Sequence, residues 1–423
     1  MKNKDITIRL IIMNFLQYAV WGAYLTSMGS YLVSIGLGSK IGLFYAMQGI
    51  VSIFMPAIIG IVADKFIPAQ KVLSLCHGIV GLRMLAAGYY GMTAGAQFGT
   101  LFALYSLSVA FYMPTIALSN SVAYSGLEKY GLDPVKDFPP IRVFGTVGFI
   151  CSMLFVNFMK IDGVQFQMTY NQFLTSGVLG IVLCLYALTL PACPVNKASG
   201  ETPSFVDIFG LRAFTLFRKK DMAIFFIFSM LLGVSLQITN GFANPFITHF
   251  KEIPEFANTW GAQNANALIS ISQISETLCI LLIPFAMKFF GIKKVMLIAM
   301  FAWVFRFGLF GAGNPGPGVW MFVLSCIVYG VAFDFFNISG SLYVNMKTDE
   351  KIRSSAQGLF MLMTNGIGAT IGTLSAQAVV NHFVYNSADP SWSSAWYVFA
   401  AYALAVGVLF MILFKDPQKQ AKA

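Results

Sequence analysis

Long runs of apolar residues follow one another along the whole chain, separated by short polar segments rich in Gly, Pro, Lys and Asp. About 20 apolar residues in a helix cross the hydrocarbon core of a bilayer. An open sheet could not satisfy its backbone hydrogen bonds in lipid, so the runs are predicted to be helices. The pattern predicts twelve membrane spans, near residues 8–33, 41–63, 71–93, 97–123, 138–159, 169–190, 222–249, 264–288, 294–312, 318–343, 355–382 and 393–414.

The composition indicates a protein that lies almost entirely in a membrane. Of the 423 residues, 57% are apolar and only 10% are charged, whereas soluble domains carry about 25% charged residues. A soluble globular protein is therefore excluded, and the spans leave no room for a separate soluble domain. The cysteines show neither a CxxC pair nor metal-ligand spacing, so we expect no metal site and no cofactor.

The basic residues lie in the connections between the apolar runs. They form no basic domain interleaved with exposed aromatic residues, so we expect no nucleic-acid partner despite the net charge of +10. With the N-terminus placed in the cytoplasm, most of the 27 lysine and arginine residues fall on the cytoplasmic side. The positive-inside rule therefore places both termini there. The first span lacks a signal-peptide cleavage site and should be retained.

The longest connection, residues 191–221, divides the spans into two groups of six. We therefore predict an all-α integral membrane protein with an N-terminal half at 1–192, a cytoplasmic linker at 193–221 and a C-terminal half at 222–423. Within the linker, residues 204–220 form an amphipathic stretch that either lies on anionic lipid headgroups or is a plain loop. Two six-helix halves joined in this way are typical of major facilitator transporters, whose binding site lies near the middle of the membrane.

A short loop pattern after the second span agrees with this architecture. Gly60-Ile-Val-Ala-Asp64-Lys65 partly matches the Gly-x-x-x-Asp-Arg/Lys loop of that superfamily, and residues 290–294 occupy the corresponding loop of the second half. We interpret Asp64 and Lys65 as gating residues that contact a neighbouring cytoplasmic helix end. The alternative is that Asp64 is a solvated loop carboxylate.

Ionisable residues inside a membrane cost at least about 2.5 to 3.5 kcal/mol each, so every one is a candidate for function. Of the 17 acidic residues, only Glu276 and Asp334 lie deep in spans. We interpret these two as proton carriers, because a buried carboxyl group can exchange a proton near neutral pH. The alternative is structural pairing with Arg142 or Arg306. The sequence leaves open which acid is the primary proton site, since two interacting acids titrate together.

The third span carries two further unusual residues. Arg83 has no partner that the sequence identifies. His77 is either a proton relay or a histidine that is hydrogen-bonded in the core.

Uncharged polar and aromatic residues recur at helical spacing in four of the same spans. Amide side chains offer donors and acceptors to hydroxyl groups and base edges, and aromatic faces stack on heterocycles. The combination suits a neutral, flat, hydroxylated solute. The alternative is that single residues of this kind only join neighbouring helices. The sets are Arg142, Thr146 and Phe149; Gln237 and Asn240, followed by Gly241, Asn244 and Pro245, which should weaken the helix; Gln273 and Glu276; and Tyr329, Phe333 and Asp334.

Several longer segments resemble the bacterial nucleoside:proton symporters of the NupG type, which belong to the major facilitator superfamily. The segments are residues 137–149, 223–233, 236–240, 271–277 and 328–340, and the likeness extends over essentially the whole chain. It implies inward, proton-driven transport of purine and pyrimidine nucleosides, such as uridine and adenosine, across the bacterial cytoplasmic (inner) membrane. It also implies that the nucleoside site is lined by Arg142, Thr146, Phe149, Gln237, Asn240, Gln273, Glu276, Tyr329, Phe333 and Asp334.

Two other functions remain as alternatives at this stage. A proton-coupled sugar transporter of the same fold would use similar amides and carboxylates, and a membrane sensor would bind nucleosides without moving them. An enzyme is not expected, because the chain has no glycine-rich nucleotide loop, metal-ligand cluster or nucleophile motif. We expect the protein to function as a monomer among membrane lipids, with protons as the coupling ion.

Overall fold

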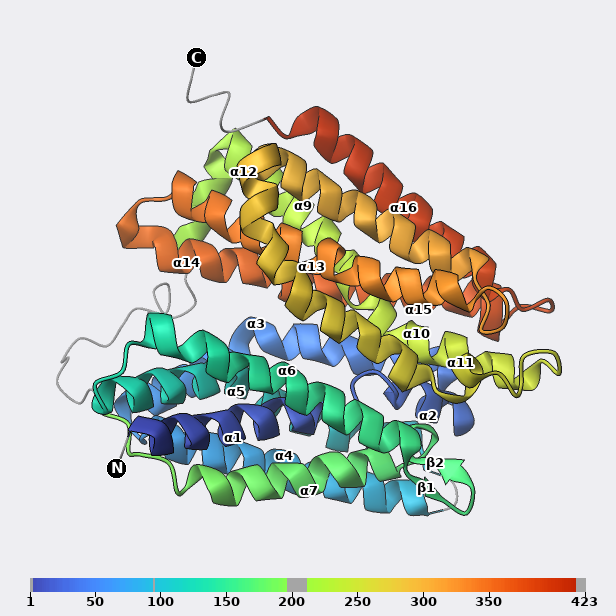
Figure 1. The fold of residues 1–423 in the computed structure, drawn as a ribbon, viewed down its shortest axis with the longest axis horizontal. Helices are drawn as coiled ribbons and strands as arrows, with labels where there is room; N and C mark the ends of the chain where they lie inside the picture. The colour runs from blue at the N-terminus through green and yellow to red at the C-terminus, as the bar shows by residue number, and fades with distance from the viewer. Residues whose placement is uncertain (1–2, 94–95, 196–210, 416–423) are drawn as a thin grey trace. The chain divides into compact units, whose positions relative to one another are not determined.

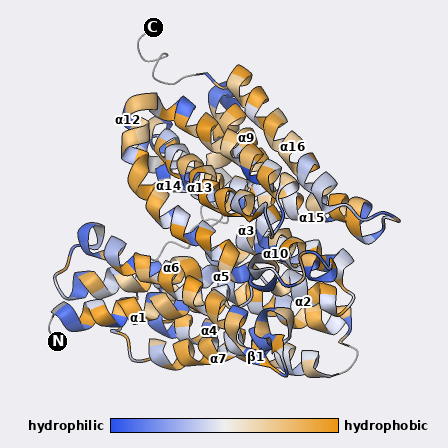
Figure 2. Cartoon of the chain, turned by 45° about the vertical axis from the view of Figure 1, so that its right-hand side comes forward, coloured by the Kyte–Doolittle hydropathy of each residue, from blue (hydrophilic) through white to orange (hydrophobic). Residues whose placement is uncertain are grey.

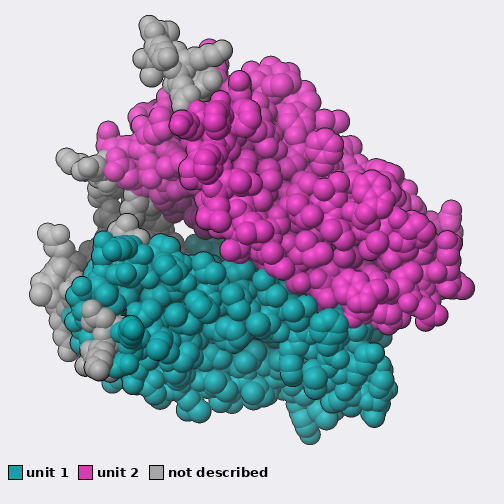
Figure 3. Space-filling model, in the orientation of Figure 1, with its two compact units in different colours: residues 1–38, 50–202 teal, residues 39–49, 203–423 magenta. Residues whose placement is uncertain are grey.

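The computed structural model describes residues 3–93, 96–195 and 211–415. In these ranges the regular secondary structure is helical apart from one two-stranded hairpin (Figure 1). It forms two compact units, which Figure 3 shows in different colours. Unit 1 comprises residues 1–38 and 50–202, and unit 2 comprises residues 39–49 and 203–423. Each unit is described below by itself.

Unit 1 is built from long helices that pack on one another around an apolar core. α1 packs on α6 and α7, and α4 packs on both α5 and α7. Buried aliphatic side chains of all these helices meet in one continuous cluster. The elements are α1 (Asn3–Gly22), α2 (Met28–Ser34), α4 (Ala69–Met92), α5 (Phe98–Lys129), α6 (Pro134–Phe158), β1 (Lys160–Ile161), β2 (Val164–Gln165), η2 (Phe166–Met168), α7 (Asn171–Ala187) and, from residue 50 onward, α3 (Ile41–Lys65).

Unit 2 holds most of the remaining helices and much of the aromatic core. α12 packs on α13 and α16, and the π-helical turn η5 packs on α9. Its elements are the first nine residues of α3, η3 (Leu211–Arg218), α9 (Lys220–Leu236), α10 (Ile238–His249), η4 (Phe250–Glu252), α11 (Trp260–Gln263), α12 (Ala265–Ala312), α13 (Val319–Lys347), α14 (Glu350–Met361), η5 (Leu362–Gly368), α15 (Ala369–Val380), η6 (Asn381–Tyr385) and α16 (Trp392–Leu413). The short helix η1 (Gly38–Lys40) lies at the change from unit 1 to unit 2.

The helices correspond to the predicted spans with four local differences. The eleventh span, predicted at 355–382, is formed by α14, η5, α15 and η6 in succession. Two predicted spans lie within α12, on either side of a kink at Gly291, where the backbone is not helical and has a φ of 74° that a residue with a side chain rarely adopts. The first span is divided into α1 and α2 by residues 23–27. The seventh is divided at Gln237, one turn before the predicted weak point at Gly241, while Pro245 lies inside α10. Nine helical segments of the described chain meet the length and hydropathy needed for crossing a membrane.

Hydrophobic residues make up much of every long helix, as the colours of Figure 2 show, and many of their side chains are exposed. Leu82 on α4 and Phe289 on α12 are 63% and 74% exposed. Surfaces of this kind aggregate in water but are stable against lipid chains. The exposed leucine and phenylalanine side chains are therefore the lipid-facing surface of a membrane protein.

Two glycines allow α1 and α6 to approach closely. A Cβ atom at Gly22 would collide with the backbone carbonyl oxygen of Phe149, and one at Gly148 would collide with that of Phe15. Because the colliding atoms belong to the backbone, they cannot move aside as a flexible side chain could. The pair of glycines therefore sets the distance between α1 and α6 at the depth of Phe149.

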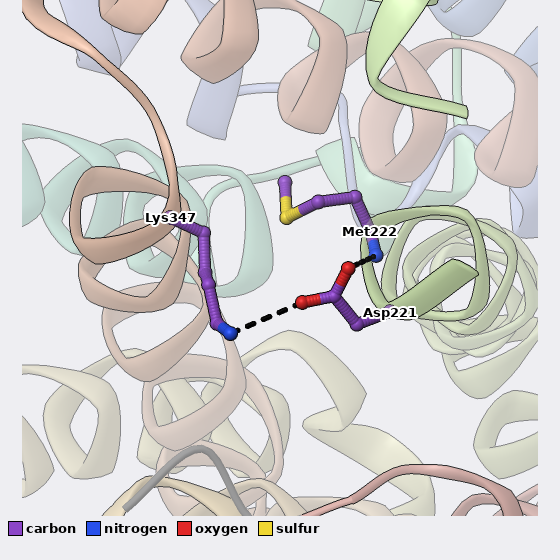
Figure 4. A network of polar contacts seen from close by, with 3 residues as sticks. All are labelled: Asp221, Met222 and Lys347. Carbon is purple, nitrogen blue, oxygen red and sulfur yellow. Dashed lines mark hydrogen bonds and ion pairs between the residues drawn. The ribbon is translucent and has the colours of Figure 1, made fainter. Parts of the chain in front are cut away.

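An ion pair joins two helix ends in unit 2 (Figure 4). The Lys347 Nζ atom at the end of α13 lies 3.1 Å from the Asp221 Oδ2 atom in the first turn of α9, and the backbone N–H of Met222 donates to Asp221 Oδ1 at 3.0 Å. Both charged side chains are about one third exposed, so the pair stabilises the contact only modestly.

Candidate functional site

The predicted residues of unit 1 lie along α6 and contact α1. The guanidinium carbon of Arg142 lies 3.9 Å from the centre of the buried Tyr18 ring, a cation–π contact. Two turns further on, the Phe149 ring meets Trp21 edge to face, with ring centres 6.2 Å apart. Thr146 lies between them and is half-buried. The structure thus confirms that Arg142, Thr146 and Phe149 share one helix, and shows that its partner at Arg142 and Phe149 is α1.

Behind these contacts lies a fully buried polar network on three helices. The His77 Nε2 atom of α4 lies 2.7 Å from Gln17 Oε1 of α1, and Gln17 Nε2 donates to Thr115 Oγ1 of α5 at 2.7 Å. The Tyr112 hydroxyl donates to the Gln17 carbonyl at 2.8 Å. All four side chains are completely buried. His77 is therefore hydrogen-bonded within the core of unit 1.

The predicted amide side chains of unit 2 are partly exposed. The Asn240 side chain donates to Gln237 Oε1 at 2.9 Å, next to the division between α9 and α10. Gln273 lies one turn before Glu276 on α12, and both are half-buried. Half-buried amides retain hydrogen-bonding groups that the protein does not fully occupy. These residues can therefore present donors and acceptors to a polar solute.

The two predicted acids and the aromatic pair of α13 form one cluster. Asp334 is 5% exposed, and its Oδ2 atom has no hydrogen-bond partner among the described residues. It lies close enough to Glu276 for the two carboxyl groups to interact electrostatically, and Tyr329 interacts with both. The Tyr329 and Phe333 rings are nearly parallel, with centres 5.7 Å apart. An uncommitted carboxyl oxygen beside a second acid is a suitable place for a mobile proton.

Arg306 lies next to this cluster and is 1% exposed. Its Nη1 atom donates to the Ser325 carbonyl at 2.7 Å and to the Ser272 hydroxyl at 3.4 Å. Its guanidinium carbon lies 4.5 Å from the centre of the Tyr329 ring. Within the described part of the chain, Arg306 Nη1 therefore donates to two serine oxygens, and the guanidinium also interacts with the Cys326 thiol. Its charge lies against the Tyr329 ring, which also interacts with the two acids.

The remaining predicted residues lie apart from these groups. Asp64 is exposed and Lys65 half-exposed at the end of α3, and Asp64 has no hydrogen bond or ion pair with any residue in the described ranges. Of the amphipathic stretch 204–220, residues 204–210 lie outside the described residues, while η3 packs on α9 and α14. No group of three potential metal-ligating side chains occurs among the residues that were described.

Sequence periodicity did not identify Trp21 or Tyr112 as neighbours of the site. Trp21 follows Gln17 by one helical turn on α1, so the two share a face. That spacing was visible in the sequence, but the helices against which the face packs were not. The contact of Trp21 with Tyr112, at 5.6 Å between ring centres, comes from the tertiary structure.

The fold is that of a major facilitator transporter. A crystal structure of a D-xylose-proton symporter matches 97% of this chain and 98% of its own length with a TM-score of 0.69 at 12% identity. A likeness at this identity shows the fold alone. Together with the apolar helical segments of the described chain, it indicates a multi-pass α-helical membrane protein of this fold.

The family follows from closer relatives. A family model described as nucleoside H+ symporter matches residues 4–419. The xanthosine permease of Escherichia coli (strain K12) is 45% identical over 422 residues, 98% of each chain, and the nucleoside permease NupG of the same strain is 44% identical over 417 residues, 97% of this chain and 96% of its own. A crystal structure of nucleoside transporter NupG covers 97% of this chain and 99% of its own with a TM-score of 0.88.

The chain belongs to the nucleoside H+ symporter family. It is a proton-coupled nucleoside transporter and not an enzyme.

Proposed function

We propose that this transporter imports purine and pyrimidine nucleosides, uridine and adenosine among them, by alternating access across the bacterial inner membrane. It functions as a monomer, with both termini in the cytoplasm. The relatives named for xanthosine and for nucleosides support this range of substrates. The excess of basic residues in the connections assigned to the cytoplasm supports the orientation.

The observation that carries the proton coupling is the environment of Asp334. Its carboxyl group is buried, one oxygen has no partner among the described residues, and Glu276 lies within electrostatic range. Two carboxylates this close repel each other when both are ionised, so binding of one proton stabilises the pair. We assign Asp334 and Glu276 as the proton-coupling residues.

Nucleoside binding is assigned to the half-buried polar side chains and the aromatic rings beside them. In unit 1, Arg142 and Thr146 provide polar groups next to Phe149, which can flank a base. In unit 2, the amides and the parallel pair of Tyr329 and Phe333 provide the same two kinds of contact. Ribose hydroxyl groups and base edges need several donors and acceptors, and a flat base gains from an aromatic face. The gating role proposed for Asp64 and Lys65 requires a contact of Asp64 with a helix end in another state of the transport cycle, because Asp64 makes no hydrogen bond or ion pair with the described residues here.

The test is uptake of labelled uridine and adenosine into vesicles that contain the purified protein, under an inward proton gradient. Uptake should overshoot equilibrium, and an uncoupler should abolish the overshoot. Equilibration without overshoot would contradict the roles of Glu276 and Asp334.

Competition tests the substrate class. Unlabelled nucleoside should displace labelled uridine much better than free ribose, a free base or a hexose does. A sugar that competed as well as a nucleoside would show a sugar transporter of the same fold. Binding without uptake would indicate a sensor.

A further inference from the structure

The buried network around Gln17 has only one arrangement of hydrogen atoms that satisfies its bonds. The Thr115 hydroxyl donates its single hydrogen to the Tyr112 carbonyl at 2.6 Å, so it must accept from the Gln17 amide nitrogen. This places Gln17 Oε1 toward His77, at 2.7 Å, where it can only accept. His77 Nε2 therefore carries a hydrogen and donates it.

The same network fixes the backbone of α1. The Tyr112 hydroxyl donates to the Gln17 carbonyl, so both the side chain and the main chain of Gln17 are held from α5. The His77 ring also packs edge to face on Tyr112, with ring centres 6.0 Å apart. Four fully buried side chains with these bonds form a rigid group, because rearranging any one would leave a further buried polar atom without a partner, in addition to His77 Nδ1, which has none among the described residues.

Trp21 connects this rigid group to Phe149. It lies one turn beyond Gln17 on α1, 5.6 Å from the Tyr112 ring and 6.2 Å from the Phe149 ring. Its Nε1 atom is buried and has no hydrogen-bond partner among the described residues, so packing against the two rings determines its orientation. The adjacent Gly22 brings the α6 backbone against α1 at Phe149 itself.

We infer that Trp21 is a positioning residue of the nucleoside site, which orients the Phe149 ring for the base and is itself held by the network of His77, Gln17 and Tyr112. The inference rests on the proposed role of Phe149 in nucleoside binding. It goes beyond that role by adding residues that do not touch the nucleoside. His77 donates from Nε2, and a second proton on its buried Nδ1 atom would find no acceptor among the described residues, so His77 is a neutral donor that takes no part in proton coupling.

The test compares uridine transport by variants of this network in proteoliposomes, measuring KM, maximal rate and sensitivity to an uncoupler. Trp21→Leu should raise KM by about 2- to 10-fold, the range of aromatic pair energies, with little change in maximal rate. His77→Leu should do the same. His77→Gln should restore KM to near the original value, because a glutamine Nε2 can donate from a similar place.

Two further variants keep the test decisive if His77→Leu fails to fold. Tyr112→Phe removes only the hydroxyl that holds the Gln17 carbonyl, and should raise KM by a few-fold while the protein still elutes as a folded species. Trp320→Leu changes an indole that is 58% exposed in unit 2 and should leave KM unchanged. Nucleoside binding should also change tryptophan fluorescence, and Trp21→Phe, unlike Trp320→Phe, should remove most of that change.

The outcomes separate this inference from the proposed function. If Phe149→Ala raises KM but Trp21→Leu and Tyr112→Phe do not, the positioning role is refuted and the nucleoside site stands. If Phe149→Ala leaves KM unchanged, the proposed site itself is wrong. If His77→Gln shifts the pH profile of transport or abolishes the overshoot, His77 moves protons and its assignment as a neutral donor is refuted.

Discussion

Replacing Asp334 by asparagine should separate nucleoside movement from proton coupling. Asp334 is almost completely buried on α13, and asparagine has nearly the same shape, so the change removes the titratable group without opening a cavity. The Asp334 Oδ2 atom has no partner among the described residues, so the substitution does not break a hydrogen bond there. We therefore expect Asp334→Asn to fold and to bind nucleosides.

The size of the effect follows from the work that one proton supplies. A proton that crosses a membrane at 100 mV contributes about 2.3 kcal/mol, which corresponds to about 50-fold accumulation of a neutral solute. Without a proton site, the same potential does no work on the nucleoside. Accumulation by Asp334→Asn should therefore fall from about 50-fold to about 1-fold at 100 mV.

The assay is uptake of labelled uridine into proteoliposomes with an imposed potential, inside negative, followed by exchange of labelled against unlabelled uridine across the same vesicles. Asp334→Asn should lose the overshoot and retain exchange. Asp389→Asn, an equivalent change of an exposed loop carboxylate, should behave as the original protein does. Undiminished accumulation by Asp334→Asn would show that Asp334 does not couple protons, and Glu276→Gln would then be the variant to examine.

Three other predictions concern stability. Gly148→Ala should destabilise the protein by about 1 to 3 kcal/mol, because the new methyl group would collide with the Phe15 carbonyl oxygen. The measurement is the melting temperature in detergent, which should fall. Gly99→Ala is the control, because its new methyl group would lie in open space. Arg83→Leu replaces an exposed charge within α4 and should favour insertion of that segment by about 3 kcal/mol in a translocon assay, without loss of transport. In a double-mutant cycle of Asp221→Ala and Lys347→Ala, the coupling free energy of unfolding should be only about 0.5 kcal/mol. A coupling free energy that stayed the same at high salt would contradict the interpretation of this pair as a solvent-screened surface contact.

The membrane spans could be predicted from the sequence because the bilayer sets their length and composition. The predicted span at 138–159, for example, corresponds to α6 at Pro134–Phe158. The irregular features could not be read from hydropathy, because the π-helical turns η5 and η6 differ from an α-helix only in backbone hydrogen bonding. The hairpin at Lys160–Gln165 did have a local signal: Asp162 and Gly163 both have positive φ, as Asp-Gly does in tight hairpin turns.

The sequence could predict which site residues share a face of one helix, but not which helices pack together to form the site. Arg142, Thr146 and Phe149 share a face by spacing alone, and α6 confirms this. The partner of Phe149 was not predictable, because Trp21 lies far away in the sequence and one helix does not specify the neighbour against which its face packs. The sequence could not show whether Arg306 pairs with either acid. In the structure its Nη1 atom donates to the Ser325 carbonyl and the Ser272 hydroxyl, which lie on helices that the sequence could not place beside it.

The two units bury polar groups by different chemical means, and the difference fits separate roles in nucleoside recognition and in proton coupling. In unit 1, His77, Gln17 and Tyr112 are neutral and mutually hydrogen-bonded, so any rearrangement loses a buried bond. In unit 2, Asp334 keeps a buried oxygen without a partner among the described residues and faces a second acid. A neutral network of mutual hydrogen bonds favours one arrangement, although the His77 Nδ1 atom has no partner among the described residues. A buried carboxyl group beside a second acid instead gains by binding a proton. A symporter needs both: a ring held at fixed geometry to recognise the base, and a group whose charge changes to couple recognition to the proton.

Substitutions in the network should therefore alter nucleoside affinity at unchanged coupling, and substitutions of the acids should alter coupling with less effect on affinity.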